Sequence, residues 1–64
     1  MALSQRIKEL RELCGMSQKD LAGKIGVNPS AVAHWELGTK KPSLDNVYKI
    51  ADAFDLTVAE LFSP

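Results

Sequence analysis

The sequence has 64 residues, with eight basic and eight acidic side chains and a formal net charge of zero at pH 7. So short a chain buries only about 60% of its unfolded surface, which predicts a single domain, residues 1–64, and leaves little room for a catalytic cleft. The one cysteine, Cys14, excludes an internal disulfide, no His/Cys cluster offers a metal site, and no apolar run suits a membrane helix, so we expect no metal, no cofactor and a reducing, cytoplasmic location.

The first predicted helix runs from Leu3 or Ser4 to Leu13 or Cys14, and Gly15 ends it. Apolar residues at helical spacing form its inward stripe: Leu3, Ile7, Leu10 and Cys14. The charged residues are expected on its solvent-facing side: Arg6, Lys8, Glu9, Arg11 and Glu12.

Two short helices joined by a tight turn are predicted over residues 18–37. Ser17 is a natural N-cap for the first of them, Asp20 stands in the position of a capping-box partner, and Gly26 ends the helix. A connection this short makes the two helices cross steeply and approach closely, which suits the small residues Ala22 and Gly26.

The second helix of this pair is predicted from Pro29 to about Leu37, with Asn28 as its N-cap. Val32 and Trp35 form its inward face. Its outward face contains no residue that the core needs: Ser30, Ala33, His34 and Leu37. Gly38 ends the helix, and a polar loop with two adjacent lysines follows before Pro42.

Ser43 caps a fourth helix, and Asp55 stands at its end, where a left-handed backbone would carry some strain. Its apolar stripe is Leu44, Val47, Ile50, Ala51 and Phe54, with Tyr48 expected to be half exposed. A short fifth helix opens with a capping box from Thr57 to Glu60. Its apolar residues either finish the core or leave one edge as a dimer surface: Val58, Leu61 and Phe62.

The chain as a whole resembles the helix-turn-helix proteins of the Cro/C1 type (XRE family), which include lambdoid phage repressors and small bacterial regulators. The resemblance rests on residues 17–37, on the opening helix from Arg6 to Arg11, and on the run after the tryptophan: Glu36, Gly38, Lys40, Lys41, Pro42, Ser43 and Leu44. It implies an all-α fold, a compact bundle of five short helices with a central helix-turn-helix.

The resemblance also implies that helix 29–37 reads the major groove of double-stranded DNA. The base-contacting residues are then Pro29, Ser30, Ala33 and His34. The phosphate-contacting residues are then Ser17, Gln18, Lys19, Asn28, Thr39, Lys40 and Lys41. We expect His34 to donate to a guanine or phosphate oxygen, although an exposed histidine is often only a surface residue.

In the resembling family an arginine at the position of Arg11 reaches the glutamate after the tryptophan, here Glu36, and holds the recognition helix in place. We therefore expect a structural ion pair between Arg11 and Glu36. A contact between Arg11 and a phosphate is the alternative.

The charges are unevenly distributed along the chain. Residues 1–41 carry seven Lys or Arg against four Asp or Glu, whereas residues 42–64 carry one against four. A domain polarised in this way can present its basic end to DNA. We expect a DNA-binding transcriptional regulator, most simply a repressor, acting as a homodimer on a near-palindromic operator with recognition helices about 34 Å apart.

A protein-interaction module on the same fold, such as an antitoxin or a co-regulator, is the alternative function, and the neutral net charge favours it. An enzyme is not expected, because no triad spacing joins the few nucleophile or base types. We expect neither a small-molecule substrate nor a small-molecule effector.

Overall fold

The computed structural model describes residues 2–63, so the two ends of the predicted 1–64 domain lie outside the described residues. It contains α1 (Leu3–Leu13), α2 (Gln18–Ile25), α3 (Pro29–Leu37), α4 (Leu44–Ala53) and α5 (Val58–Phe62). No strand occurs within that range. The predicted all-α fold of five short helices is confirmed, and each helix begins and ends within one or two residues of its expected bounds.

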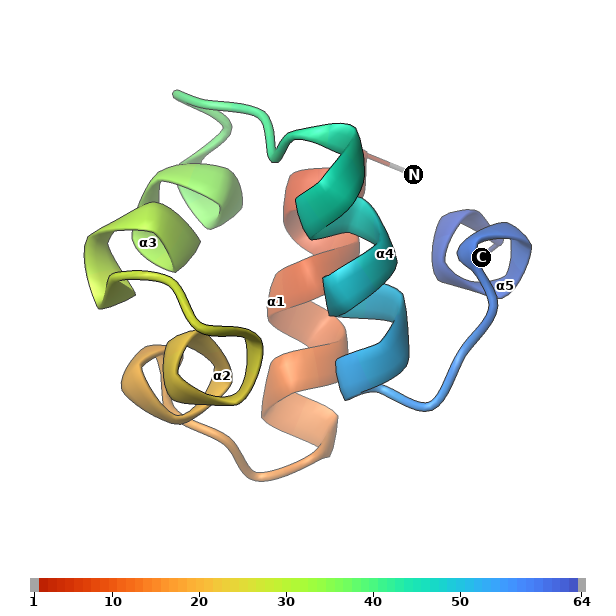
Figure 1. The fold of residues 1–64 in the computed structure, drawn as a ribbon, viewed down its shortest axis with the longest axis horizontal. Helices are drawn as coiled ribbons and strands as arrows, with labels where there is room; N and C mark the ends of the chain where they lie inside the picture. Colours follow the sequence, from red (N-terminus) through yellow and green to blue (C-terminus); the bar gives the residue numbers. More distant parts are fainter. Residues whose placement is uncertain (1, 64) are drawn as a thin grey trace.

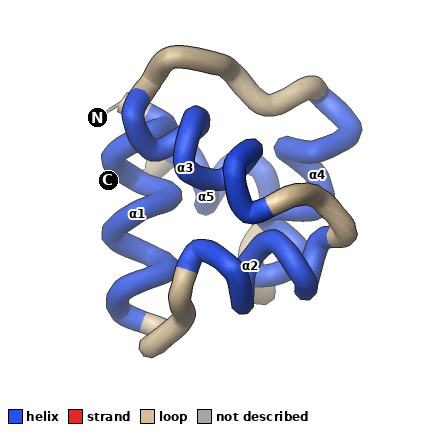
Figure 2. The backbone as a smooth tube through the Cα atoms, turned by 90° about the vertical axis from the view of Figure 1, so that its left-hand side faces the viewer, coloured by secondary structure: helices blue, strands red, loops and turns tan. Residues whose placement is uncertain are grey.

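The helices divide the molecule into two sides (Figure 1). The α2–α3 pair lies on the left in that view and α5 on the right, with α1 and α4 between them. α2 packs against both α3 and α4, α3 also packs against α1, and α5 packs against α4 and α1. Figure 2 looks directly onto α2 and α3, with α5 behind them. No helix in the described part is long and apolar enough to cross a membrane.

Every helix contributes one completely buried large side chain to a shared core. These five residues are 0% exposed: Ile7, Leu21, Val32, Ile50 and Leu61. Burial of an aliphatic side chain of this size contributes about 1.5–3 kcal/mol relative to exposure. The stability of the fold therefore depends on all five helices at once.

The helix starts follow the cap residues of the sequence. The Ser17 hydroxyl accepts the Asp20 N–H at 2.9 Å, and the Asp20 carboxylate accepts the Ser17 N–H at 3.0 Å. Thr57 and Glu60 make the same reciprocal pair at 3.1 and 2.9 Å. These hydrogen bonds from the N-cap backbone and hydroxyl hold the pKa values of Asp20 and Glu60 below their ordinary values. Both predicted capping boxes are confirmed.

Left-handed residues stop the helices at the predicted places. Gly26 ends α2 with φ of 79°, and Gly38 ends α3 with φ of 78°. Asp55, between α4 and α5, has φ of 58° and is the one non-glycine residue with positive φ in residues 2–63. An L-residue with a Cβ is sterically strained in this region, as the sequence indicated.

Two predictions about individual side chains are wrong. Cys14 is exposed rather than part of the α1 stripe, because the helix ends at Leu13 and Cys14 is only its C-cap. Leu44 is 70% exposed, because it is the first residue of α4 and lies almost one turn before Val47, the first buried residue of that helix. The predicted N-cap position of Asn28 is confirmed, although its side chain makes no cap hydrogen bond.

Candidate nucleic-acid interface

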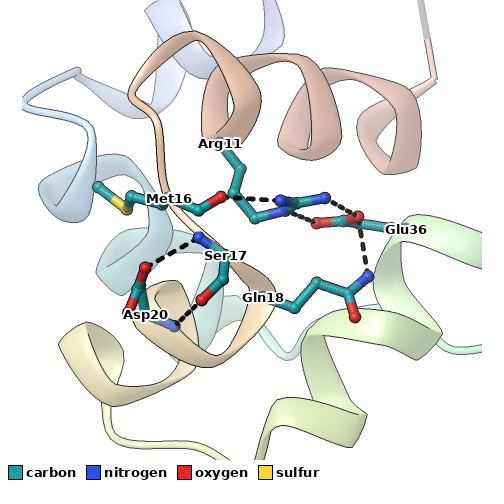
Figure 3. Close-up of polar contacts among 6 residues, drawn as sticks. All are labelled: Arg11, Met16, Ser17, Gln18, Asp20 and Glu36. Atoms are coloured by element: carbon teal, nitrogen blue, oxygen red, sulfur yellow. Dashed lines mark hydrogen bonds and ion pairs between the residues drawn. The ribbon is translucent and has the colours of Figure 1, made fainter.

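A part-buried polar network fixes α3 against α1 and α2 (Figure 3). Arg11 on α1 donates from Nε and Nη2 to the two carboxylate oxygens of Glu36 on α3, at 2.7 and 3.0 Å. Its third nitrogen, Nη1, donates to the Met16 carbonyl oxygen at 2.8 Å. Gln18 at the start of α2 donates from Nε2 to Glu36 Oε1 at 3.1 Å. The predicted ion pair between Arg11 and Glu36 is confirmed, and Gln18 completes it.

This network is almost closed to solvent, since the side chains of Arg11 and Glu36 are 12% and 4% exposed. Burial raises the pKa of Glu36, but the hydrogen bonds from Arg11 and Gln18, with the positive charges of Arg11 and Lys8, outweigh it and leave the pKa below its ordinary value. The hydrogen bond to Glu36 correspondingly raises the pKa of Arg11. Both groups are therefore charged at neutral pH, and the pair fixes the direction in which α3 points.

The opposite surface of α3 faces away from the core. Val32 and Trp35 are buried beneath the helix, at 0% and 5% exposure. Ser30 is exposed on the outer surface, and Ala33 and His34 are half-buried there. This surface therefore presents one hydroxyl, one methyl and one imidazole around the first two turns of a helix.

His34 does not project freely. Its Nδ1 lies 2.8 Å from the hydroxyl oxygen of Thr39, and that hydroxyl also donates to the His34 carbonyl oxygen at 3.3 Å. The contact forms because the left-handed Gly38 turns the chain back over the end of α3, where the Thr39 N–H donates to the same carbonyl at 3.1 Å. Sequence reasoning missed this contact and assigned Thr39 to a phosphate.

The remaining predicted phosphate contacts surround α3. Ser17 and Lys19 at the start of α2 are exposed, and Gln18 is half-buried because it reaches Glu36. A Gln amide carries two hydrogens, so Gln18 retains one for another acceptor. Asn28 and Pro29 are exposed at the start of α3, and Lys40 and Lys41 are exposed in the loop after it. Figure 2 looks onto this surface, with the starts of both helices and the loop at its edges.

Comparison with known protein families identifies the family of this chain. Residues 7–61 match the helix-turn-helix family. The chain belongs to the helix-turn-helix family, of the Cro/C1 type. Its members are DNA-binding transcriptional regulators, and we assign that function to the chain.

Individual helix-turn-helix proteins match over nearly the whole chain. An uncharacterised HTH-type transcriptional regulator of Archaeoglobus fulgidus is 42% identical over 57 residues, 89% of this chain and 81% of the relative. The restriction-modification controller protein C.AhdI of Aeromonas hydrophila superposes with a TM-score of 0.90 at 41% identity, covering 95% of this chain and 92% of its own. The biofilm master regulator SinR, solved in complex with DNA, gives a TM-score of 0.86 at 32% identity and covers 95% of this chain and 98% of its own.

The apolar residues of α5 divide between the two alternatives that the sequence left open. Leu61 is completely buried and belongs to the core, so it cannot form a dimer surface. Val58 is partly buried against the core, whereas Phe62 is 52% exposed. Phe62 therefore remains as the main apolar contact that α5 offers to a second copy.

Arg6 holds α5 in place, a role that sequence reasoning missed. Predicted on the solvent side of α1, it donates from Nε to the Leu61 carbonyl oxygen at 3.0 Å and from Nη2 to the Glu60 carbonyl oxygen at 3.1 Å. The last carbonyls of a helix lack partners within it, and Arg6 supplies them for α5. No sequence signal could reveal this contact, because its acceptors are backbone groups.

Proposed function

We propose that this regulator reads its operator with the outer surface of α3 lying in the major groove. The observation that carries the proposal is the two-sided character of α3. One side is fixed to α1 and α2 through Glu36, while the opposite side presents Ser30, Ala33 and His34 without any role in the core. A helix that binds in the major groove must be held in a fixed orientation and must leave a polar face exposed.

The base contacts follow from the chemistry of that face. Ser30 can donate to or accept from a base edge, and Pro29 and Ala33 can contact a thymine methyl group. We propose phosphate contacts for the exposed residues around α3: Ser17, Gln18, Lys19, Asn28, Lys40 and Lys41. Thr39 is left out of this set, because its hydroxyl is already bound to His34.

We propose that the working species is a two-fold homodimer on a near-palindromic operator. A single module of this size contacts only part of one turn of DNA. Phe62 on α5 is 52% exposed and is the apolar contact that we propose for the second copy. A two-fold dimer on B-DNA places its recognition helices about 34 Å apart, in two successive major grooves.

Such a dimer acts as a repressor wherever its operator overlaps a promoter, because bound protein and polymerase cannot occupy the same DNA. Its site of action is the cytoplasm, where the DNA of a bacterium or archaeon lies. The proposal needs neither a catalytic group nor a bound effector.

The test is selection of bound duplexes from a random-sequence pool at moderate salt. Wild type should enrich a two-fold motif, and a Ser30→Ala, His34→Ala double variant should weaken or change it. A Lys49→Ala, Asp52→Ala variant is the matched control, because it also removes two exposed side chains and lies on α4. The proposal fails if wild type enriches nothing, or if the double variant and wild type select the same motif with equal affinity.

The phosphate contacts have a separate measurement. Each lysine that neutralises a phosphate contributes about 0.9 to the slope of log affinity against log salt. Lys40→Ala and Lys41→Ala should each reduce that slope by about one while leaving the selected motif unchanged. An unchanged slope would remove that lysine from the interface.

A protein-interaction module remains the second candidate function, because α4 and α5 expose three large apolar residues: Leu44, Tyr48 and Phe62. Exposed apolar surface of this kind is typical of protein-binding faces. Tight, salt-insensitive association with a protein, in the absence of any selected duplex, would favour this function over DNA reading.

A further inference from the structure

The contact between His34 and Thr39 restricts how the imidazole can use its two nitrogens. Nδ1 lies 2.8 Å from Thr39 Oγ1, and Oγ1 is also positioned to donate to the His34 carbonyl oxygen at 3.3 Å. The turn at Gly38 brings these groups together and also supplies the Thr39 N–H to the same carbonyl at 3.1 Å. Only Nε2 is therefore left for a partner outside the protein.

The number of hydrogens decides which nitrogen carries the proton. A threonine hydroxyl has one hydrogen. When that hydrogen goes to the His34 carbonyl, Oγ1 must accept from the ring, so Nδ1 carries the proton and both hydrogen bonds form. When the Thr39 hydroxyl instead donates its hydrogen to Nδ1, it has none left for the His34 carbonyl oxygen, and only one of the two hydrogen bonds forms. The Nδ1–H tautomer is therefore favoured by one hydrogen bond.

We propose that Thr39 holds neutral His34 in the Nδ1–H tautomer and that His34 Nε2 consequently accepts from an amino group of a DNA base. This inference rests on the proposed position of α3 in the major groove. In a neutral imidazole with hydrogen on Nδ1, Nε2 is an acceptor only.

The major groove contains just two kinds of amino donor, adenine N6 and cytosine N4. Guanine O6, guanine N7 and the phosphate oxygens are acceptors, which an unprotonated Nε2 cannot bind. His34 is therefore a residue that selects adenine or cytosine, and Thr39 is the residue that positions it. The sequence-based expectation that His34 donates to a guanine or phosphate oxygen is thereby reversed.

The tautomer can be measured without DNA, because His34 is the one histidine of the chain. Long-range proton–nitrogen NMR correlations at about pH 8, where imidazole side chains are neutral, distinguish the two forms. Wild type and Thr39→Ser should show Nδ1–H. Thr39→Val keeps the shape but removes the hydroxyl, and it should shift the ring toward Nε2–H. Nε2–H in wild type, or no difference between Thr39→Ser and Thr39→Val, would overturn the proposal.

The base contact is tested with single-atom changes in the selected operator. At the base pair whose preference is lost in His34→Ala, adenine is replaced by purine, or cytosine by 2-pyrimidinone, to delete the amino group. The affinity of wild type should fall about three- to tenfold, which corresponds to the loss of one hydrogen bond. The affinity of His34→Ala for the same duplexes should not change. A 7-deaza purine at that base pair, which removes an acceptor instead, should leave wild-type binding unchanged.

The outcomes separate this inference from the proposed function. A selected operator that responds to the 7-deaza change but not to loss of the amino group would overturn the inference and leave DNA reading by α3 intact. The inference is likewise overturned if neither change alters binding, or if His34→Ala keeps every base preference. Failure to select any operator would overturn both.

Discussion

Two arginines of α1 hold the two sides of the molecule, and they use different kinds of partner. Arg11 binds the carboxylate of Glu36 on α3 through two hydrogen bonds, and both side chains are nearly buried. Arg6 donates to the carbonyl oxygens of Glu60 and Leu61 on α5, where the contact is part-buried to exposed. α3, the helix that we propose reads DNA, is thus held by a charge pair, and α5 by a charged donor on neutral acceptors.

The kind of partner determines how each side responds when its arginine contact is removed. Removal of one member of a nearly buried pair leaves the other charge poorly solvated, which disfavours the position of α3 that the pair fixes. Removal of Arg6 leaves carbonyl groups at a helix end, which water can hydrate. We therefore expect the α3 side, which we propose reads DNA, to be held more tightly than α5.

The largest predicted effect is the loss of stability on removal of Arg11. Arg11→Ala should destabilise the fold by about 3–5 kcal/mol, because the Glu36 carboxylate stays buried with Gln18 as its remaining side-chain partner. Urea unfolding measures the loss, which is large enough to unfold a domain of this size.

A second variant keeps that prediction testable if Arg11→Ala does not fold. The double variant Arg11→Met, Glu36→Leu removes both charges and should recover most of the stability. Its DNA affinity should remain reduced, because the ion pair no longer fixes the orientation of α3. A double variant no more stable than Arg11→Ala would show that packing rather than the charge pair holds α3.

The corresponding change on the other side should be smaller. Arg6→Met should cost about 1–2 kcal/mol, since two charge-assisted hydrogen bonds are lost but their acceptors can be hydrated. Hydrogen exchange should speed up in α5 and remain slow in α2 and α3. Lys24→Met is the control, because Lys24 is an exposed cation on α2 that takes no part in the contacts of Arg6 or Arg11. Equal losses of unfolding free energy in Arg6→Met and Arg11→Ala would show that the two sides are held equally strongly.

Acid should weaken the ion pair of Arg11 with Glu36 but not the contacts of Arg6, because the acceptors of Arg6 are backbone carbonyl oxygens that do not titrate. The pKa of Glu36 is lowered in the folded state, so its contribution is complete above the unfolded value of about 4.3 and is lost as the pH falls through the folded value. The lowered pKa values of Asp20 and Glu60 act in the same direction. Unfolding free energies measured from neutral to acid pH should therefore fall less steeply for Glu36→Gln than for wild type, and equally steeply for Arg6→Met and wild type.

The smallest effect concerns the connection that leads into α5. Asp55→Gly should stabilise the fold by about 1 kcal/mol, because glycine adopts φ of 58° without a Cβ clash. Thermal unfolding measures the gain, with Lys49→Gly, in the interior of α4, as a control that should destabilise. A loss of stability in Asp55→Gly would mean that the aspartate side chain compensates for its backbone conformation.

The features that could be predicted from sequence are those whose signals are local. Ser17 with Asp20, Thr57 with Glu60, and the glycines after α2 and α3 act within one turn of their own position, and all lie as expected. The ion pair between Arg11 and Glu36 joins distant residues, yet it was accessible because both members are charged side chains and the family resemblance connects them.

The errors have equally specific causes. Helical periodicity does not show which turns of a helix the core covers, which is why Cys14, just past the end of α1, and Leu44, the first residue of α4, were assigned to the core. The contacts of Arg6 were hidden because their acceptors are backbone oxygens. The bond from His34 to Thr39 was hidden because it exists only after the chain reverses at Gly38. Individual DNA contacts of α3 remain predictions, because each depends on a base sequence that the protein chain does not contain.

The sharing of one core by all five helices has a consequence for how the two sides communicate. Global unfolding exposes the same five side chains whichever helix opens first, so all five helices contribute to one global free energy of unfolding. An operator bound at α3 at about one hundred times its dissociation constant would stabilise the whole domain by about 2.7 kcal/mol. Helix α5, on the opposite side, would share in that stabilisation. DNA binding would therefore protect both sides of the domain against global unfolding, without any change in how the helices are arranged.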